Sequence, residues 1–122
     1  MKKILVVEDD RYLSNAYRVK LEKMGFIVKT AGDGEEALEI LKDFQPDLIL
    51  LDLVMPRKDG FTTLEEIKQN GALKSIPVLI ATNLGQKEDV ERGMKLGAVD
   101  YLVKTDTSVE DFANKIKSIL KV

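Results

Sequence analysis

Acidic side chains follow two short apolar runs, and they are the residues in this chain best placed to do chemistry. Glu8, Asp9 and Asp10 follow the first run, and Asp52 follows the second, at residues 48–51. Short apolar runs without alternation are typical of parallel strands that are buried on both faces. Because ligands bind at the carboxyl ends of such strands, the acids should meet at one edge of the sheet if the two strands are neighbours.

A cluster of carboxylates needs a source of positive charge. Two ionised carboxylates about 4 Å apart repel by roughly 4 kcal/mol at an effective dielectric constant of about 20. Bound protons or a divalent cation would relieve this repulsion, and oxygen ligands favour Mg²⁺ or Mn²⁺. The acids therefore predict either protonated groups or a metal site, with Mg²⁺ as the expected cofactor and Mn²⁺ as the alternative.

The ends of two further expected strands add a hydroxyl and an ammonium group. Thr82 follows the run at 77–81, and Lys104 follows the run at 101–103. Metal-neutralised carboxylates beside a lysine and a hydroxyl are suited to receive a phosphoryl group, because positive charge stabilises the oxygens during transfer. Asp52 is then the candidate nucleophile and would form an acyl phosphate.

The composition removes several other kinds of chemistry. The chain has no cysteine and no histidine, which excludes a thiolate nucleophile, a thiolate zinc site and a Ser-His-Asp triad. Any phosphohistidine in the reaction must belong to a partner. A net charge of −2 with dispersed lysines gives no electrostatic case for direct nucleic-acid binding. The apolar run after Lys3 is too short for a signal peptide, so we expect a cytoplasmic protein without a membrane segment.

Strand and helix patterns alternate five times along the 122 residues, without a linker, repeat or low-complexity tract. Such alternation is typical of a parallel sheet with right-handed crossovers. The strongest apolar runs belong in the middle of the sheet and the weak second strand at an edge, which predicts the flavodoxin-like strand order 2-1-3-4-5. We expect one α/β domain over residues 1–122, a doubly wound five-stranded parallel sheet with helices on both faces and strands at 4–7, 26–28, 48–51, 77–81 and 101–103.

Local signals indicate where the expected helices begin, weaken and end. Asp10 is predicted to cap the first helix, and either Ser108 or Thr107 to cap the last one. Gly93 lowers the intrinsic stability of the fourth helix from within, and Gly97 is expected to end it.

The chain resembles the receiver domain of two-component response regulators, in the form found in chemotaxis regulators. The resemblance covers the whole sequence, and its motifs stand in the family's order and spacing. They are Val7-Glu8-Asp9, Asp52 with Met55-Pro56, Asp59-Gly60, Ala81-Thr82 and Tyr101-Leu102-Val103-Lys104.

The resemblance implies a Mg²⁺-dependent phosphorylation site. Asp52 would accept the phosphoryl group from a histidine kinase or a phosphotransfer protein, and would ligate Mg²⁺ together with Asp9. Glu8 would act mostly through metal-bound water, and the carbonyl of Val54 would be a further ligand. The protein would catalyse its own phosphorylation and dephosphorylation, but it would act as a signalling protein and not as a turnover enzyme.

The resemblance also implies a switch. Thr82 would hydrogen-bond the phosphoryl group and Lys104 would pair with it, while Tyr101 would turn inward when Thr82 moves. The output would be phosphorylation-dependent binding of a protein target to the face formed by the fourth helix, the fifth strand and the fifth helix. No output domain follows in the sequence, so we expect a stand-alone receiver or a piece of a longer regulator.

Two positions depart from the family pattern. Thr105 stands where the family usually has a proline after a cis peptide bond, a geometry that costs about 2.5–4 kcal/mol for a non-proline residue. We therefore expect the Lys104–Thr105 bond to be trans or strained, and a trans bond to loosen the placement of Lys104. Asn83 replaces a small residue and is expected to narrow the access to Asp52.

Other classes of protein fit less well. A flavodoxin needs a Ser/Thr/Gly-rich loop after the first strand, and the acids found there would repel its phosphate. A haloacid-dehalogenase-like phosphatase needs Asp-x-Asp after a strand, and Val54 occupies the second acidic position. The remaining alternative is a receiver-like interaction module that keeps the fold but is not phosphorylated. Labelling by acetyl phosphate, or binding of beryllofluoride in Mg²⁺, distinguishes the two.

Overall fold

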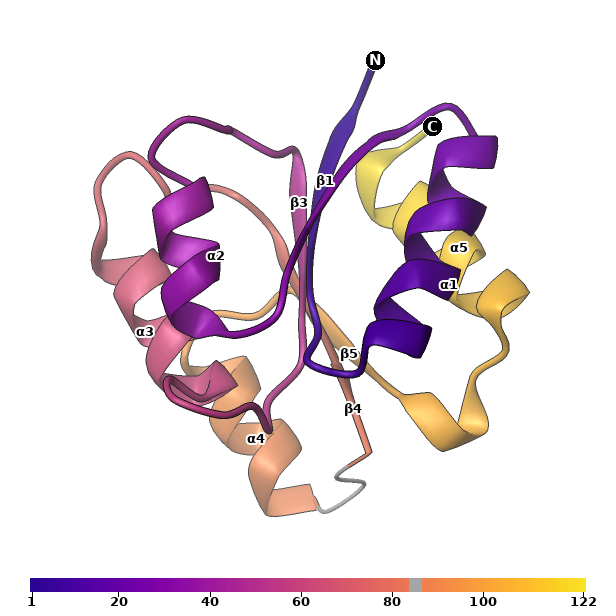
Figure 1. The fold of residues 1–122 in the computed structure, drawn as a ribbon. Coiled ribbons are helices and arrows are strands. Elements are labelled where there is room, and N and C mark those ends of the chain that lie inside the picture. Colours follow the sequence, from indigo (N-terminus) through magenta and orange to yellow (C-terminus); the bar gives the residue numbers. More distant parts are fainter. Residues whose placement is uncertain (84–86) are drawn as a thin grey trace.

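The centre of the fold is a parallel sheet with the strand order β2-β1-β3-β4-β5 (Figure 1). It is seen in a computed structural model, which describes residues 1–83 and 87–122. The order and the parallel direction confirm the fold predicted from the sequence. The strands are β1 (Lys3–Val7), β2 (Ile27–Ala31), β3 (Leu48–Leu51), β4 (Val78–Thr82) and β5 (Asp100–Val103).

Helices cover both faces of this sheet, and in Figure 1 two of them lie to its right and three to its left. None of the helices in the described ranges is long and apolar enough to cross a membrane. A short 3₁₀ turn, Lys104–Asp106, links β5 to the last helix. The right-hand pair is α1 (Arg11–Lys23) and α5 (Val109–Leu120), and the left-hand group is α2 (Gly34–Ile40), α3 (Gly60–Gln69) and α4 (Lys87–Lys95).

Two apolar layers fill the space between the sheet and the helices. On the α1 and α5 side, the rings of Tyr17 and Phe112 stack with their centroids 4.2 Å apart, and both residues are buried. On the other side, Leu64 and Ile67 of α3 are fully buried. Every residue of β3 and β4 is buried, which explains the apolar runs without alternation in the sequence. The carboxyl ends of these strands are therefore held rigidly.

The second strand lies at an edge, as predicted, but its boundaries differ from the prediction. It spans 27–31 and not 26–28, because Phe26 belongs to the turn that ends α1. The N–H of Phe26 donates to the carbonyl of Leu21 over 3.1 Å. The strand itself is half exposed and includes the polar Lys29 and Thr30, as expected for an edge position with weak apolar patterning.

Side-chain caps fix the start of several helices. Asp10 accepts a hydrogen bond from the N–H of Leu13 over 3.1 Å at the start of α1, as the sequence predicted. Ser108 accepts from the N–H of Asp111 over 3.0 Å, so of the two predicted caps for α5 the structure contains the Ser108 cap. Gly97, two residues after the end of α4, has a φ of +111°, a conformation that favours glycine at a helix end.

The glycine inside α4 allows this helix to approach the sheet. Gly93 is buried, and a Cβ atom on it would lie only 2.3 Å from Cδ1 of Ile80 in β4. The helix is also held to the start of α3, where the guanidinium of Arg92 lies 4.1 Å from the ring centroid of Phe61. Gly93 thus weakens the helix intrinsically but is required by the packing of α4 on β4.

This contact predicts an unusual response to Gly93→Ala. Glycine to alanine in a helix normally stabilises by up to about 1 kcal/mol, but overpacking against Ile80 should lower the free energy of unfolding by about 1–3 kcal/mol. Urea unfolding measures the change. In an Ile80→Val background, which lacks Cδ1, the same substitution should cost less. A Gly93→Ala variant as stable as the wild type would contradict the close approach.

Candidate functional site

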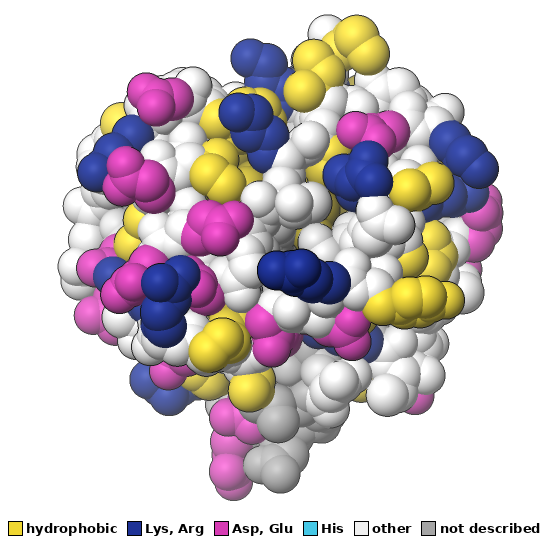
Figure 2. All heavy atoms as spheres, in the orientation of Figure 1, with side chains coloured by type: hydrophobic (Ala, Val, Ile, Leu, Met, Phe, Trp, Pro, Cys, Tyr) yellow, Lys and Arg dark blue, Asp and Glu magenta, His cyan; other side chains and the backbone are white. Residues whose placement is uncertain are grey.

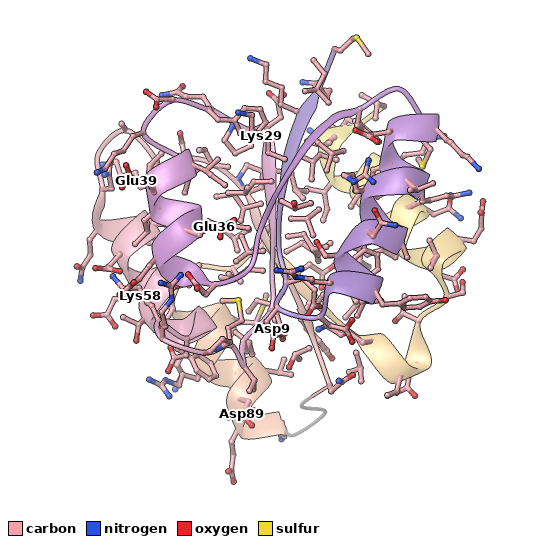
Figure 3. All side chains as sticks on the ribbon, in the orientation of Figure 1. Asp9, Lys29, Glu36, Glu39, Lys58 and Asp89 are labelled. Carbon is pink, nitrogen blue, oxygen red and sulfur yellow. The ribbon has the colours of Figure 1, made fainter. Side chains whose placement is uncertain are left out.

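The candidate site is a hollow of about 370 Å³ at the carboxyl ends of the central strands. This end of the molecule lies opposite the two termini in Figure 1, and Figure 3 labels Asp9 at it. The residues predicted from the sequence as candidate ligands and catalytic groups meet there. The lining residues are Glu8, Asp9, Asp10, Leu13, Asp52, Val54, Thr82, Asn83 and Lys104.

Strand pairing places the acids side by side. Val7 at the end of β1 pairs with Leu51 at the end of β3, and the N–H of Asp52 donates to the carbonyl of Val7 over 3.0 Å. Glu8 and Asp52 therefore leave adjacent strands at the same level. Their exposed fractions are 4% and 6%, whereas Asp9 is exposed to solvent.

The three carboxylates form a compact group that fits a divalent cation. One oxygen from each of Glu8, Asp9 and Asp52 can be chosen so that all lie within 4.8 Å of one another. An all-oxygen set, with one member open to solvent, suits Mg²⁺ or Mn²⁺, which retain water among their ligands. The backbone carbonyl of Val54 comes two residues after Asp52, and its residue lines the same hollow. The fold thus brings together the oxygen donors that the sequence predicted.

A buried ammonium group provides positive charge within this acidic group. The side chain of Lys104 is 8% exposed, and its Nζ lies 3.1 Å from Oδ2 of Asp52. The same Nζ donates a short hydrogen bond to Oε1 of Glu8. The other oxygen of Glu8 accepts from the N–H of Asp10 over 3.1 Å. Lys104 therefore links the predicted nucleophile to a predicted metal-site acid.

Burial changes the protonation of these acids. Loss of hydration raises the pKa of Glu8 from 4.5 to about 7, while the hydrogen bond from Lys104 opposes the rise and the charge of Asp52 adds to it. Burial also raises the pKa of Asp52, against the opposing effect of Lys104. On the apolar side of the site, burial and then the charges of Glu8 and Asp52 raise the pKa of Tyr17 to about 12. The raised pKa values and the ammonium of Lys104 both act to reduce the repulsion between the carboxylates.

The departure at Thr105 does not displace Lys104. The peptide bonds of the described residues are trans, including Lys104–Thr105, and residues 104–106 form the 3₁₀ turn. The trans bond is one of the two predicted alternatives, and with it the side chain of Lys104 is buried between two carboxylates.

The remaining predicted residues divide into those at the hollow and those outside it. Thr82 ends β4, is fully buried and lines the hollow, and Asn83 is exposed at its rim. Tyr101 is 39% exposed and does not line it. Asp10 lines it but caps α1, as expected. Arg57 was not predicted from the sequence as a residue of interest; it lies in the loop after Asp52 and forms an ion pair with Asp33. Its signal in the sequence is an arginine in a loop between Pro56 and Gly60, which is too unspecific to identify a functional residue.

The face of the molecule shown in Figure 2 does not carry charge of one sign. The described acidic and basic side chains are interspersed on it, and hydrophobic side chains lie singly or in small groups between them.

Comparison with known proteins identifies the family. Residues 4–117 match the model of the response regulator receiver domain, and the chain belongs to this family. The DNA-binding dual master transcriptional regulator RpaA of Synechocystis sp. is 37% identical over 121 residues, which are 99% of this chain and 50% of RpaA. The chain thus spans about half the length of this curated relative.

Solved structures agree with this assignment. The chemotaxis response regulator CheY4 of Vibrio cholerae superposes with a TM-score of 0.90 at 28% identity, over 98% of each chain. The Mn²⁺-bound form of the response regulator Rcp1 superposes with a TM-score of 0.84 at 34% identity, over 97% of this chain and 93% of Rcp1. A receiver of similar fold therefore holds a divalent cation, the kind of ion that the oxygen cluster here fits.

The raised pKa of Glu8 predicts how stability depends on pH without metal. The folded protein binds a proton at Glu8 more tightly than the unfolded chain, so this contribution to stability is complete below pH 4.5 and is lost as the pH rises through about 7. Urea unfolding in EDTA should therefore give a lower free energy of unfolding at pH 8 than at pH 5.5. Glu8→Gln should reduce the difference and stabilise the protein at pH 8.

The matched control is Glu39→Gln, which removes an exposed acid paired with Lys42. It should leave the pH dependence unchanged. A Glu8→Gln variant with the same pH dependence as the wild type would show that Glu8 is ionised in the folded protein at neutral pH.

Proposed function

We propose that the protein is a cytoplasmic phosphoacceptor, which takes a phosphoryl group from a histidine kinase or a phosphotransfer protein onto Asp52. The observation that carries this proposal is the contact of 3.1 Å between Lys104 and Asp52 at the edge of a cluster of three carboxylates. A structural ion pair alone would not need two further acids at the same place. The position of the cluster at the carboxyl end of a parallel sheet supports a site for chemistry.

In the proposed reaction an oxygen of Asp52 attacks the phosphorus of a partner's phosphohistidine. The P–O bond forms, the P–N bond breaks, and the imidazole of the partner leaves with the electron pair. A bound Mg²⁺, held by Asp9, Asp52 and the Val54 carbonyl with Glu8 nearby, would neutralise negative charge on the phosphoryl oxygens. Lys104 pairs with the phosphoryl group on the side of the site where it already meets Asp52.

We further propose that the output is binding of a protein target by the face of α4, β5 and α5. This face contains the partly exposed Tyr101, Met94 and Val109, and the net charge of −2 does not favour direct contact with nucleic acid. RpaA, twice as long, is named as a DNA-binding regulator. Binding to DNA by a longer protein that contains this chain is therefore compatible with a receiver that contacts only protein.

The first test is labelling of the protein with acetyl phosphate in Mg²⁺. The wild type should gain one phosphoryl group, seen by intact-mass spectrometry, and Asp52→Asn should gain none because the amide is not a nucleophile. Asp9→Ala should weaken Mg²⁺ binding and slow labelling. Asp59→Asn, which alters a helix cap outside the hollow, is the matched control. An unlabelled wild type would favour the interaction module, and labelling of Asp52→Asn would exclude Asp52 as the nucleophile.

The second test concerns the proposed switch. Ile80 pairs with Tyr101 across β4 and β5, and Thr82 pairs with Val103, so a shift at Thr82 passes directly to the strand of Tyr101. Backbone NMR spectra with and without beryllofluoride in Mg²⁺ should show shifts at Tyr101 and across residues 87–97. The Asp52→Asn variant should show none. Changes confined to the residues around Asp52 would contradict a switch that reaches the α4, β5 and α5 face.

A further inference from the structure

The loop between β3 and α3 carries the carbonyl proposed as a metal ligand, and its end at Gly60 is fixed to the backbone of the residues that directly follow β3. The N–H of Gly60 donates to the carbonyl of Leu53 over 3.0 Å. A Cβ atom on Gly60 would lie 2.2 Å from the carbonyl oxygen of Asp52, so the loop returns in direct contact with the phosphorylation site. The placement of Val54 then depends on what holds the middle of the loop.

In the middle of this loop, Arg57 adopts a backbone conformation that is unfavourable for a side chain. Its φ is +62°, in the left-handed region that glycine adopts far more readily than other residues. In the described ranges, Lys121 at the end of α5 is the other non-glycine residue with positive φ. An arginine at such a position has a conformational cost that a glycine would not have, and its side chain makes an interaction that glycine could not supply.

That interaction is an ion pair with a buried aspartate. Nε of Arg57 donates to Oδ2 of Asp33 over 2.7 Å, and Nη2 makes a shorter contact with the same oxygen. The side chain of Asp33 is 8% exposed, and its other oxygen accepts from the N–H of Glu36 over 2.9 Å at the start of α2. Asp33 thus joins the loop after β3 to the first turn of α2.

The backbone supports the same junction. The N–H of Gly34 donates to the carbonyl of Lys58 over 3.2 Å. A Cβ atom on Gly34 would lie 1.9 Å from Oγ1 of Thr63 and 2.8 Å from the carbonyl oxygen of Lys58. The start of α2 therefore sits against both the loop and the first turn of α3, with no room for a side chain between them. Figure 3 shows Lys58 beside the lower end of α2 and α3.

We propose that Arg57 and Asp33 are positioning residues for the phosphorylation site. Their ion pair holds the loop against α2 and so keeps the carbonyl of Val54 where it can bind Mg²⁺ beside Asp52. This inference rests on the proposed function. Met55 is buried in the core and anchors the loop as well, so loss of the ion pair should weaken metal binding without abolishing it. Partners that orient metal ligands typically contribute about 10–100-fold to affinity, and we expect about tenfold.

The decisive variant is Arg57→Gly, because it removes the ion pair and also removes the backbone strain. If the ion pair has a structural role alone, Arg57→Gly should change the stability little and leave the Mg²⁺ affinity unchanged. If the ion pair positions the loop, the variant should be fully folded and bind Mg²⁺ more weakly. Mg²⁺ titration followed by NMR should give a dissociation constant about tenfold higher than that of the wild type. The amide proton of Gly34 should also exchange faster, because its acceptor lies in the released loop.

Further variants isolate the ion pair itself. Asp33→Asn keeps an oxygen that can cap α2 but removes the charge, so it should weaken Mg²⁺ binding as Arg57→Gly does. The double variant should bind no more weakly than either single variant, and Arg57→Lys should recover part of the affinity. Arg18→Ala, which breaks the exposed pair with Glu22, should bind Mg²⁺ like the wild type.

The outcomes separate this inference from the proposed function. Folded Arg57→Gly with wild-type Mg²⁺ affinity would overturn the positioning role, whatever its melting temperature. A wild type that binds no Mg²⁺ would overturn the proposed function and, with it, this inference. Gly34 exchange in the same two proteins would then still show whether the ion pair holds the loop.

Discussion

The ammonium group of Lys104 lies between two buried carboxylates, and the rest of the site is arranged around this contact. Glu8 and Asp52 leave adjacent strands at the same level, so the sheet itself forces their charges together. Removing one partner from a buried ion pair typically costs about 3–5 kcal/mol, because the remaining charge is left without compensation. Because its positive charge offsets their negative charge, the lysine at the end of β5 allows acidic residues to follow both β1 and β3. In the proposed reaction, the same charge would pair with the phosphoryl group.

The positive charge of Lys104 does not fully balance the negative charge of the acids, and this has a chemical consequence. One ammonium contacts two of three carboxylates, and one oxygen from each of the three lies within 4.8 Å of the others. Burial raises the pKa of Glu8 to about 7. The raised pKa favours retention of a proton by Glu8 as the pH approaches neutrality. A divalent cation would replace that proton, so metal binding and proton release are linked.

Much of this architecture could be predicted from the sequence, for identifiable reasons. Residues 48–51 form an unbroken apolar run because both faces of β3 are covered, and acids placed directly after such strands must converge. The boundaries of β2 were wrong because Phe26 is apolar but belongs to the turn after α1. Arg57 was missed because its positive φ runs against its own preference, and only the position of Asp33 in three dimensions explains it. The second partner of Lys104, Glu8, likewise depends on side-chain geometry.

The packing of α4 indicates how a change at the site can reach the surface. β4 joins three features: Thr82 lies at the hollow, Ile80 contacts Gly93 of α4, and Ile80 also pairs with Tyr101 of β5. Close-packed interiors do not deform continuously, so a shift of β4 must be absorbed where the packing is least interlocked. At Gly93 the helix presents bare backbone to the strand, whereas α1 and α5 are joined by stacked rings. A shift that begins at Thr82 should therefore move α4 before it moves the helices α1 and α5 on the opposite face of the sheet.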